Sequence, residues 1–435
     1  MQILFYTLGC KVNQYETQAM MKMMTEQGYE AGEYTLGTVL PDNSVIVINS
    51  CTVTGESDRK LRQLLRRCRR DNPHAVLVLT GCMPQAFPDV AERFTEADIV
   101  LGNAARKALP SHLHQFVTLG QRIVDVSQHS GTFESMEIDE FQGRTRAFVK
   151  IQDGCNRFCS YCIIPYARGR VRSKSLEELR HEVETLAQKG YREVVLVGIN
   201  LTAYGQDLGF SLCDAVDITC AVENILRVRL GSLEPDMMSE EVVQRLALQP
   251  KLCPQFHLSL QSGCDATLRR MNRHYTTAEF REVCDRLRLA FPHCALTTDV
   301  MVGFPGETDE EFADSLHFVK EIGFSKVHVF PYSRRPGTPA DKAPGQVPNS
   351  EKTERSHRMM EVCEQTRDAY LQSFIGKKQE VLLETRNDEN GLSEGYTPNY
   401  LPIKVKTDHI AGETILVRIN AVKNGCCFAD EYTGE

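Results

Sequence analysis

The stretch RAFVKIQDGCNRFCSYC, residues 146–162, decides the fold, because a strand-like run leads directly into three closely spaced cysteines. Cys155, Cys159 and Cys162 have the spacing C-x3-C-x2-C. A four-iron cluster normally takes one thiolate per iron, so a compact loop with three cysteines leaves the fourth iron open. The alternative is a zinc site completed by a distant His or Cys, although zinc sites generally use paired C-x2-4-C knuckles. The spacing therefore favours a [4Fe-4S] cluster with one free iron.

Outward from this loop, strand-like and helix-like segments alternate along the chain. Strands are predicted at 146–152, 193–200, 227–233, 256–261, 296–305 and 326–332, and helices at 175–189, 239–248, 276–290 and 309–322. Serial βα units predict a full or partial TIM-like barrel, whose chemistry lies at the carboxyl ends of its strands. The cysteine loop follows the first strand and so occupies such an end.

Before the barrel, three apolar runs each stop at a cysteine: ILFYTLGC at Cys10, SVIVINSC at Cys51 and AVLVLTGC at Cys82. Buried strands that alternate with helices predict an open parallel sheet of the flavodoxin-like type. The carboxyl ends of its strands face one crevice. The three thiols are therefore expected to meet there as a second three-ligand site, the alternative being ordinary buried cysteines.

The chain is expected to form three domains, at residues 1–141, 142–372 and 373–435, with a polar, acidic linker before the first boundary. The last domain contains the runs KKQEVLLE, YLPIKVKT and ETILVRINAV, separated by Gly, Asn and Asp. These short runs predict a small β-barrel. Barrels of this size often bind oligonucleotides, although the fold alone does not assign that task.

Composition narrows the class of protein. No run approaches the roughly 20 apolar residues needed to cross a bilayer, so we expect no membrane association and a cytoplasmic location. The 16 cysteines are then better interpreted as metal ligands or inert thiols than as disulfides. The net charge of −8 argues against a nonspecific nucleic-acid binder. Residues 57–70 are locally basic, which fits either a solvated helix face or an RNA contact.

With Tyr161 before the last cysteine, the loop resembles the motif of the radical S-adenosylmethionine (SAM) superfamily residue for residue. The resemblance implies that SAM chelates the open iron. It also implies that an electron from the cluster cleaves SAM to methionine and a 5′-deoxyadenosyl radical, which abstracts hydrogen from an unreactive C–H bond. The protein would position the reactive carbon and exclude water.

Other strand ends supply candidate SAM contacts. A glycine at 198 permits close approach of the methionine amino group, whereas polar side chains could bond ribose or carboxylate and an arginine could pair with the carboxylate. The alternating Arg168, Arg170 and Arg172 fit either a solvated strand face or contact with SAM or phosphate. The candidate cofactor-binding residues are Tyr161, Gly198, Asn200, Ser259, Gln261 and Arg273.

The whole arrangement resembles the methylthiotransferase family, which combines an N-terminal three-cysteine domain, a radical SAM barrel and a C-terminal TRAM domain. Family enzymes replace C–H by C–SCH3, with one SAM as methyl donor to a sulfur on an auxiliary cluster and another as radical source. The resemblance implies two [4Fe-4S] clusters and a reductant such as flavodoxin or ferredoxin. The auxiliary ligands would be Cys10, Cys51 and Cys82, and the catalytic cluster ligands Cys155, Cys159 and Cys162.

The opening stretch TLGCKVNQYET, residues 7–17, is most similar to the branch that acts on N(6)-threonylcarbamoyladenosine beside the tRNA anticodon. Branches that modify isopentenyladenosine in tRNA, or an aspartate of a ribosomal protein, are the alternatives. An iron-sulfur electron carrier or an RNA-binding scaffold is the alternative outside this class. Two features depart from the family pattern, a mildly acidic last domain and the pair Cys426–Cys427, which we interpret as structural because adjacent thiols are poor chelators.

Overall fold

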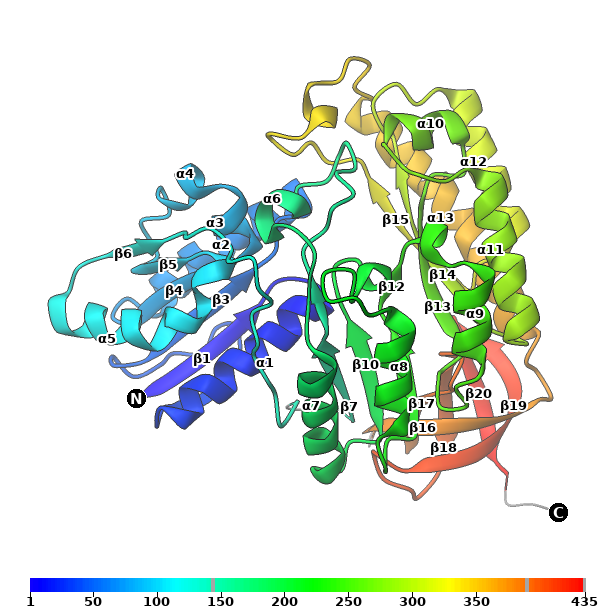
Figure 1. The fold of residues 1–435 in the computed structure, drawn as a ribbon, viewed down its shortest axis with the longest axis horizontal. Helices are drawn as coiled ribbons and strands as arrows, with labels where there is room; N and C mark the ends of the chain where they lie inside the picture. Colours follow the sequence, from blue (N-terminus) through cyan, green and yellow to red (C-terminus); the bar gives the residue numbers. More distant parts are fainter. Residues whose placement is uncertain (142–144, 388–390, 433–435) are drawn as a thin grey trace.

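The structure is a computed structural model that describes residues 1–141, 145–387 and 391–432. An open parallel sheet, a curved sheet backed by helices and a small closed barrel follow one another along the chain (Figure 1). The predicted fold class is therefore confirmed. The predicted boundary at residue 142 lies outside the described residues.

The N-terminal sheet has the strand order β2-β1-β3-β4-β5-β6, and all its strand pairs are parallel. Its first five strands follow the flavodoxin-like order, which reverses direction between β1 and β3. The strands are β1 (Gln2–Thr7), β2 (Glu30–Glu33), β3 (Val45–Ser50), β4 (Val76–Gly81), β5 (Ile99–Leu101) and β6 (Ile123–Asp125). The helices are α1 (Lys11–Glu26), α2 (Gly55–Asp71), α3 (Cys82–Ala86), α4 (Pro88–Ala91) and α5 (Leu109–Leu119), with a 3₁₀ turn η1 (Asn103–Ala108).

The central part is a partial barrel of parallel strands in sequential order. One sheet has the order β11-β10-β7 and the next has the order β12-β13-β14-β15. The predicted strand 227–233 is divided at Gly231 into β11 and β12, so it contributes to both sheets. The strands are β7 (Arg146–Lys150), β10 (Glu193–Val197), β11 (Arg227–Leu230), β12 (Ser232–Leu233), β13 (Gln255–Gln261), β14 (Ala295–Val302) and β15 (Lys326–Pro331), and the short pair β8 (Gln152–Asp153) and β9 (Arg172–Ser173) flanks the cysteine loop.

Helices cover the outer face of this curved sheet (Figure 1). Several begin at the predicted residues because a serine or threonine caps them, as Ser175 caps α7 and Thr308 caps α12. The helices α6, α8 and α10 were not predicted. The helices are α6 (Ile164–Arg168), α7 (Leu176–Gln188), α8 (Leu212–Ala221), α9 (Glu240–Ala247), α10 (Asp265–Arg270), α11 (Thr277–Ala290), α12 (Asp309–Ile322) and α13 (Asn349–Gln372), with 3₁₀ turns η2 (Leu201–Ala203), η3 (Pro235–Met237) and η4 (Pro339–Lys342).

The C-terminal strands close into a barrel with the order β16-β17-β18-β20-β19, as predicted. Arginines at the amino ends of the central strands dock onto it. Arg229 donates to the carbonyl oxygens of Thr397 at 2.8 Å and Pro398 at 2.6 Å. Its guanidinium also lies 4.8 Å from the ring centre of Tyr400. The strands are β16 (Lys378–Asn387), β17 (Leu392–Tyr396), β18 (Pro402–Lys406), β19 (Thr414–Lys423) and β20 (Cys426–Glu431).

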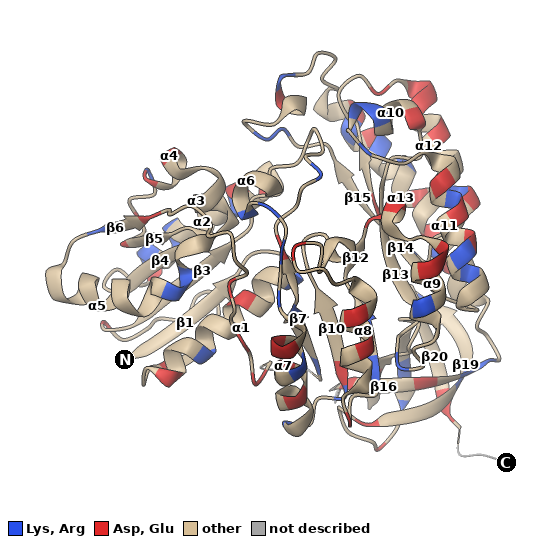
Figure 2. Ribbon diagram, viewed as in Figure 1, with Lys and Arg blue, Asp and Glu red and all other residues tan. Residues whose placement is uncertain are grey.

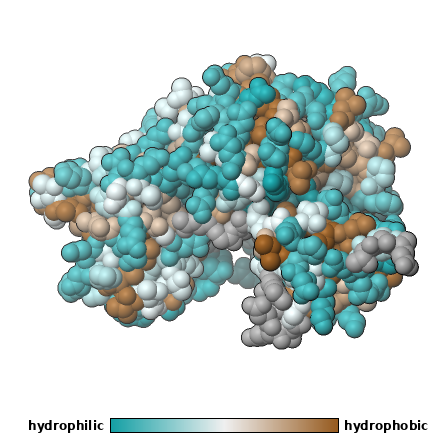
Figure 3. Space-filling model, turned by 90° about the horizontal axis from the view of Figure 1, so that it is seen from below, coloured by the Kyte–Doolittle hydropathy of each residue, from teal (hydrophilic) through white to brown (hydrophobic). Residues whose placement is uncertain are grey.

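Acidic and basic residues are interspersed over the outer helices (Figure 2). The face in Figure 3 is largely hydrophilic, with small hydrophobic patches. Within the described ranges, no helix combines the length and apolar character that a bilayer crossing requires. The basic helix α2 is partly neutralised, because Arg69 pairs with Asp98 at 2.6 Å and Arg59 with Glu56 at 2.5 Å. This pairing favours the solvated face over the RNA contact for part of the helix.

Candidate active site with two sets of cysteines

The loop that carries Cys155, Cys159 and Cys162 follows β7 and the short strand β8. It therefore lies at the carboxyl end of the first barrel strand, as predicted. Its first turn requires a glycine. Gly154 has a φ of 75°, and a Cβ there would lie 1.9 Å from the carbonyl oxygen of Arg170. The Cys155 amide donates to the Gly169 carbonyl at 3.0 Å, which closes the loop against the end of α6.

The three thiols of this loop interact with one another. Burial raises the pKa of Cys162 to about 12, and the neighbouring Cys159 and Cys155 contribute to the rise. Two donors point at the sulfurs: the Arg157 amide lies 3.4 Å from Cys155 Sγ, and Arg273 Nη1 lies 3.3 Å from Cys159 Sγ. Donors of this kind suit thiolates that ligate iron.

Arg273 is the most highly connected of the predicted SAM contacts. It pairs with Glu234 at 2.5 Å and donates to the Ser259 carbonyl at 2.9 Å and to the Tyr275 hydroxyl at 3.1 Å. Burial raises the pKa of the Tyr161 hydroxyl, and Arg273, Cys159 and Cys162 also affect it. Tyr161 therefore lies near Arg273 and these thiols. The ring of Tyr161 also meets Phe304 edge-on at 6.4 Å.

Gly198 and Asn200 directly follow β10. Gln152 Oε1 accepts from the amides of Ile199 and Asn200, both at 2.8 Å. A Cβ at Gly198 would lie 2.8 Å from Gln152 Oε1, so the glycine is required by this internal contact. The Asn200 side chain hydrogen-bonds to Cys155, whose pKa is raised by burial.

Ser259 and Gln261 belong to β13, and Gln261 ends the strand with a φ of 69°. Their proposed contacts with SAM stay predictions. Sequence reasoning missed Gln152, Glu234 and Tyr275. Glu234 directly follows the predicted strand 227–233, so its position at a strand end was the available signal.

The second set of thiols lies at the carboxyl ends of β1, β3 and β4. Burial raises the pKa of Cys51 to about 12, and the thiols of Cys82 and Cys10 add to the rise, which places the three near one another. The loops are held together by side-chain amides. Asn13 Nδ2 donates to Asn49 Oδ1 at 3.2 Å, and Asn49 Nδ2 returns a bond to the Asn13 carbonyl at 3.0 Å.

Gly81 permits the third loop to approach the second. Its φ is 107°, and a Cβ there would lie 2.3 Å from the carbonyl oxygen of Ser50. Cys51 and Cys82 are therefore forced to leave their strands side by side. Cys10 precedes α1, and its thiol donates to Asn13 Oδ1 at 3.3 Å.

Among the described residues, no three His, Cys, Asp or Glu side chains meet closely enough to hold one metal ion. A four-iron cluster does not need such a meeting point, since each thiolate binds its own iron. Neighbouring thiols and tight glycine turns fit one cluster at each set, and N–H donors also point at two sulfurs of the first set. The residues that would hold them are Cys155, Cys159 and Cys162 at one site and Cys10, Cys51 and Cys82 at the other.

A buried ionic network joins the two sites. Arg168, at the end of α6, donates to Glu16 of α1 at 2.7 Å and to Asp153 at 3.2 Å. Lys150 contacts the same two carboxylates at 2.8 and 2.6 Å. All four side chains are almost fully buried. The predicted solvated strand face of Arg168, Arg170 and Arg172 is therefore wrong for Arg168, which is buried and pairs with carboxylates of the protein. The alternative of a contact with SAM or phosphate stays a prediction.

Arg172 is buried as well and donates to the Arg168 carbonyl at 2.9 Å, whereas Arg170 stacks over Phe158 at 4.6 Å.

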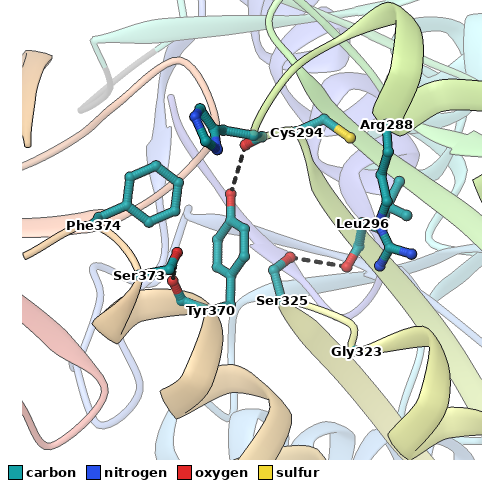
Figure 4. A pocket seen from close by; sticks show the side chains of 9 residues that line it. Arg288, Cys294, Leu296, Gly323, Ser325, Tyr370, Ser373 and Phe374 are labelled. Atoms are coloured by element: carbon teal, nitrogen blue, oxygen red, sulfur yellow. Dashed lines mark hydrogen bonds between the residues drawn. The ribbon is translucent and has the colours of Figure 1, made fainter. Parts of the chain in front are cut away.

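A separate pocket lies away from both sets of cysteines, between α13 and the start of β14 (Figure 4). Tyr370 and Ser325 line it and bond the carbonyls of His293 at 3.2 Å and Leu296 at 2.9 Å. It contains none of the predicted site residues.

Residues 149–319 match the Radical SAM superfamily, and residues 2–102 match the Uncharacterized protein family UPF0004. A solved structure of the radical SAM methyltransferase TsrM from Kitasatospora setae shares the fold, with a TM-score of 0.56 and 14% identity over 78% of this chain and 75% of that chain. The barrel and its cysteine loop thus define a radical SAM protein.

The curated relatives narrow this class. The threonylcarbamoyladenosine tRNA methylthiotransferase MtaB of Bacillus subtilis is 38% identical over 96% of this chain and 93% of its own length. The protein of the same name from Thermotoga maritima is 38% identical over 99% and 97%. A tRNA-2-methylthio-N(6)-dimethylallyladenosine synthase of Clostridium perfringens is 33% identical over 95% and 94%. The chain belongs to the radical SAM methylthiotransferase family, in the branch that contains the MtaB proteins.

Proposed function

We propose that this chain transfers a methylthio group to carbon 2 of N(6)-threonylcarbamoyladenosine next to the anticodon of tRNA. The observation that carries the proposal is the position of Cys10, Cys51 and Cys82 at the carboxyl ends of three neighbouring parallel strands. Buried ion pairs join this sheet to the helix that follows the cysteine loop of a radical SAM barrel. A simple radical SAM hydrogen abstraction needs one cluster. A second three-thiol site fits a reaction that also inserts sulfur.

The two clusters, when bound, would supply the electron that splits SAM and the sulfur chemistry of the transfer. The side chains of the protein would position SAM and exclude water. Arg273 and Glu234 fix each other at 2.5 Å beside Cys159, so a SAM carboxylate would meet a guanidinium that is already oriented. Tyr161, within the loop, meets the ring of Phe304 edge-on, and this apolar contact would limit the access of water.

The closed C-terminal barrel supports an RNA substrate, since small barrels commonly bind oligonucleotides. An RNA substrate beside the anticodon also supports a cytoplasmic location. The reductant would be a flavodoxin or ferredoxin, because the cluster needs single electrons. The proposed domains are residues 1–141, 142–372 and 373–435.

The test is nucleoside mass analysis of bulk tRNA from a strain that lacks the gene, with the wild-type strain as reference. The 2-methylthio form of threonylcarbamoyladenosine should disappear while its precursor accumulates. An unchanged nucleoside would remove the proposal. Loss of methylthiolated isopentenyladenosine instead, or of a methylthio group on a ribosomal protein, would assign the chain to one of the other branches.

Anaerobic reconstitution provides the second test. The reconstituted protein with SAM and a reductant should release 5′-deoxyadenosine, and threonylcarbamoyladenosine in added tRNA should gain the methylthio mass. An electron carrier or an RNA-binding scaffold would release no 5′-deoxyadenosine.

A further inference from the structure

The central strands form a partial barrel with β7 at one outer edge and β15 at the other. Its inner face carries polar side chains. In parallel pairing, opposed residues share a face. Phe148 of β7 and Arg229 of β11 both lie level with Val195 of β10, so they share the inner face. On the opposite edge, His328 and Phe330 of β15 are exposed, Phe330 at 43%. The inner face is thus accessible from the side of β15.

Lys11 reaches this face from the N-terminal sheet. It begins α1 directly after Cys10, and α1 packs against β7. Its Nζ lies 5.8 Å from the ring centre of Phe148. The ammonium group therefore lies beside the inner face of β7.

Lys11 differs from the neighbouring cations in having no anionic partner. Arg229 pairs with Glu193 at 2.6 Å, and Arg146 pairs with Glu384 at 3.0 Å. Throughout the part of the chain that the structure describes, no carboxylate lies within 4.0 Å of the Lys11 ammonium. Arg146 and Arg229 are its positive neighbours. Like charges at close range are unfavourable until an anion joins them.

We propose that Lys11 binds the carboxylate of the substituent on N6 of the target adenosine, and so selects the substrate. This inference rests on the proposed function. A threonylcarbamoyl group carries a carboxylate, whereas a dimethylallyl group carries no charge. An ammonium on an accessible inner face, beside a ligand of the second thiol site, fits the first substituent. A dimethylallyl group would leave this cation without a partner.

The test compares three anticodon stem-loop RNAs of one sequence, which carry threonylcarbamoyladenosine, dimethylallyladenosine or unmodified adenosine. Binding to the anaerobically reconstituted full chain is measured by fluorescence anisotropy with SAM present. The wild-type protein should bind the carboxylated RNA about tenfold to a hundredfold more tightly than the unmodified one, as expected for a bond between charged groups. Lys11→Gln and Lys11→Met should abolish that ratio, and Lys11→Arg should keep most of it.

Lys22→Gln is the matched control, because Lys22 lies on the same helix and pairs with Glu26 at 3.9 Å. It should leave all three affinities unchanged. The ratio between RNAs within one variant is the readout, so a general loss of affinity or of iron cancels. Equal weakening of all three RNAs in Lys11→Gln would indicate a backbone phosphate contact and overturn the proposal, as would an unchanged ratio.

The proposed function can fail separately. If the wild-type protein methylthiolates the dimethylallyl RNA and ignores the carboxylated one, the function is wrong. If it methylthiolates the carboxylated RNA and Lys11→Gln keeps the full binding preference, only the assignment of Lys11 is wrong.

Discussion

Arg168 and Glu16 form a buried ion pair of 2.7 Å that connects α6, at the end of the radical SAM loop, with α1, which begins beside Cys10. Both side chains are 1% exposed. Arg168 also lies near the second thiol site, because its helix α6 packs against α3, which begins at Cys82. The Arg168 guanidinium therefore contacts α1, which follows Cys10, and β8, which precedes Cys155.

Removal of this guanidinium should destabilise the contact between the two parts. Arg168→Met leaves the buried Glu16 and Asp153 carboxylates short of a partner, which costs about 3–5 kcal/mol. The denaturant midpoint should fall, and hydrogen exchange in α1 and α6 should accelerate. Arg245→Met is the control, because Arg245 is 44% exposed in its pair with Asp214 and should cost at most about 1 kcal/mol. Equal effects of the two substitutions would contradict the structural role of Arg168.

The pH dependence of the same contact follows from Glu16. Burial alone would raise its pKa, but Arg106, Arg168 and Lys150 outweigh it and hold the pKa well below the ordinary 4.5. A depressed folded pKa gives stability that is present above the unfolded pKa and is lost as the pH falls toward the folded one. The difference in unfolding free energy between wild type and Glu16→Gln should therefore stay constant from pH 8 to 5 and shrink below about pH 4. A difference that changes between pH 8 and 6 would contradict this assignment.

The sequence predicted what depends on local pattern and topology. Apolar runs that end at Cys10, Cys51 and Cys82 predicted parallel strands, and parallel strands bring their carboxyl ends to one edge. The division of the predicted strand 227–233 at Gly231 was not foreseen, because a one-residue bend leaves the apolar pattern almost unchanged.

Long-range partners could not be predicted. Arg168 pairs with Glu16, 152 positions earlier in the chain, so nothing near Arg168 distinguishes a buried arginine from a solvated one. The bond between Asn13 and Asn49 is hidden for the same reason, since it depends on the approach of two loops from different strands. Gln152 was passed over because its role, to bond the amides of Ile199 and Asn200, exists only in the folded barrel.

The two sets of cysteines should be separable by substitution. Cys159→Ala removes a ligand of the proposed SAM-cleaving cluster, so 5′-deoxyadenosine release should be abolished. Cys51→Ala should retain that release but stop formation of the methylthio nucleoside. Each variant should lose about four irons, one cluster's complement. Anaerobic iron assay and product analysis measure both effects, and equal loss of SAM cleavage in the two variants would refute the division of labour.

Gly81→Ala tests the second thiol site without removing a thiol. A Cβ at residue 81 would lie 2.3 Å from the Ser50 carbonyl oxygen, and the φ of 107° disfavours any L side chain. Relief of this clash should move Cys82 away from Cys51, at a cost of about 1–3 kcal/mol. The variant should then lose iron from the second site and form no methylthio nucleoside, while SAM cleavage persists. Gly120→Ala is the control, because its φ is also positive, at 64°, but nothing lies within 4 Å of the added Cβ. It should keep both clusters, and a Gly81→Ala protein with full iron and full transfer would show that the close approach of the two loops is not needed to hold the second cluster.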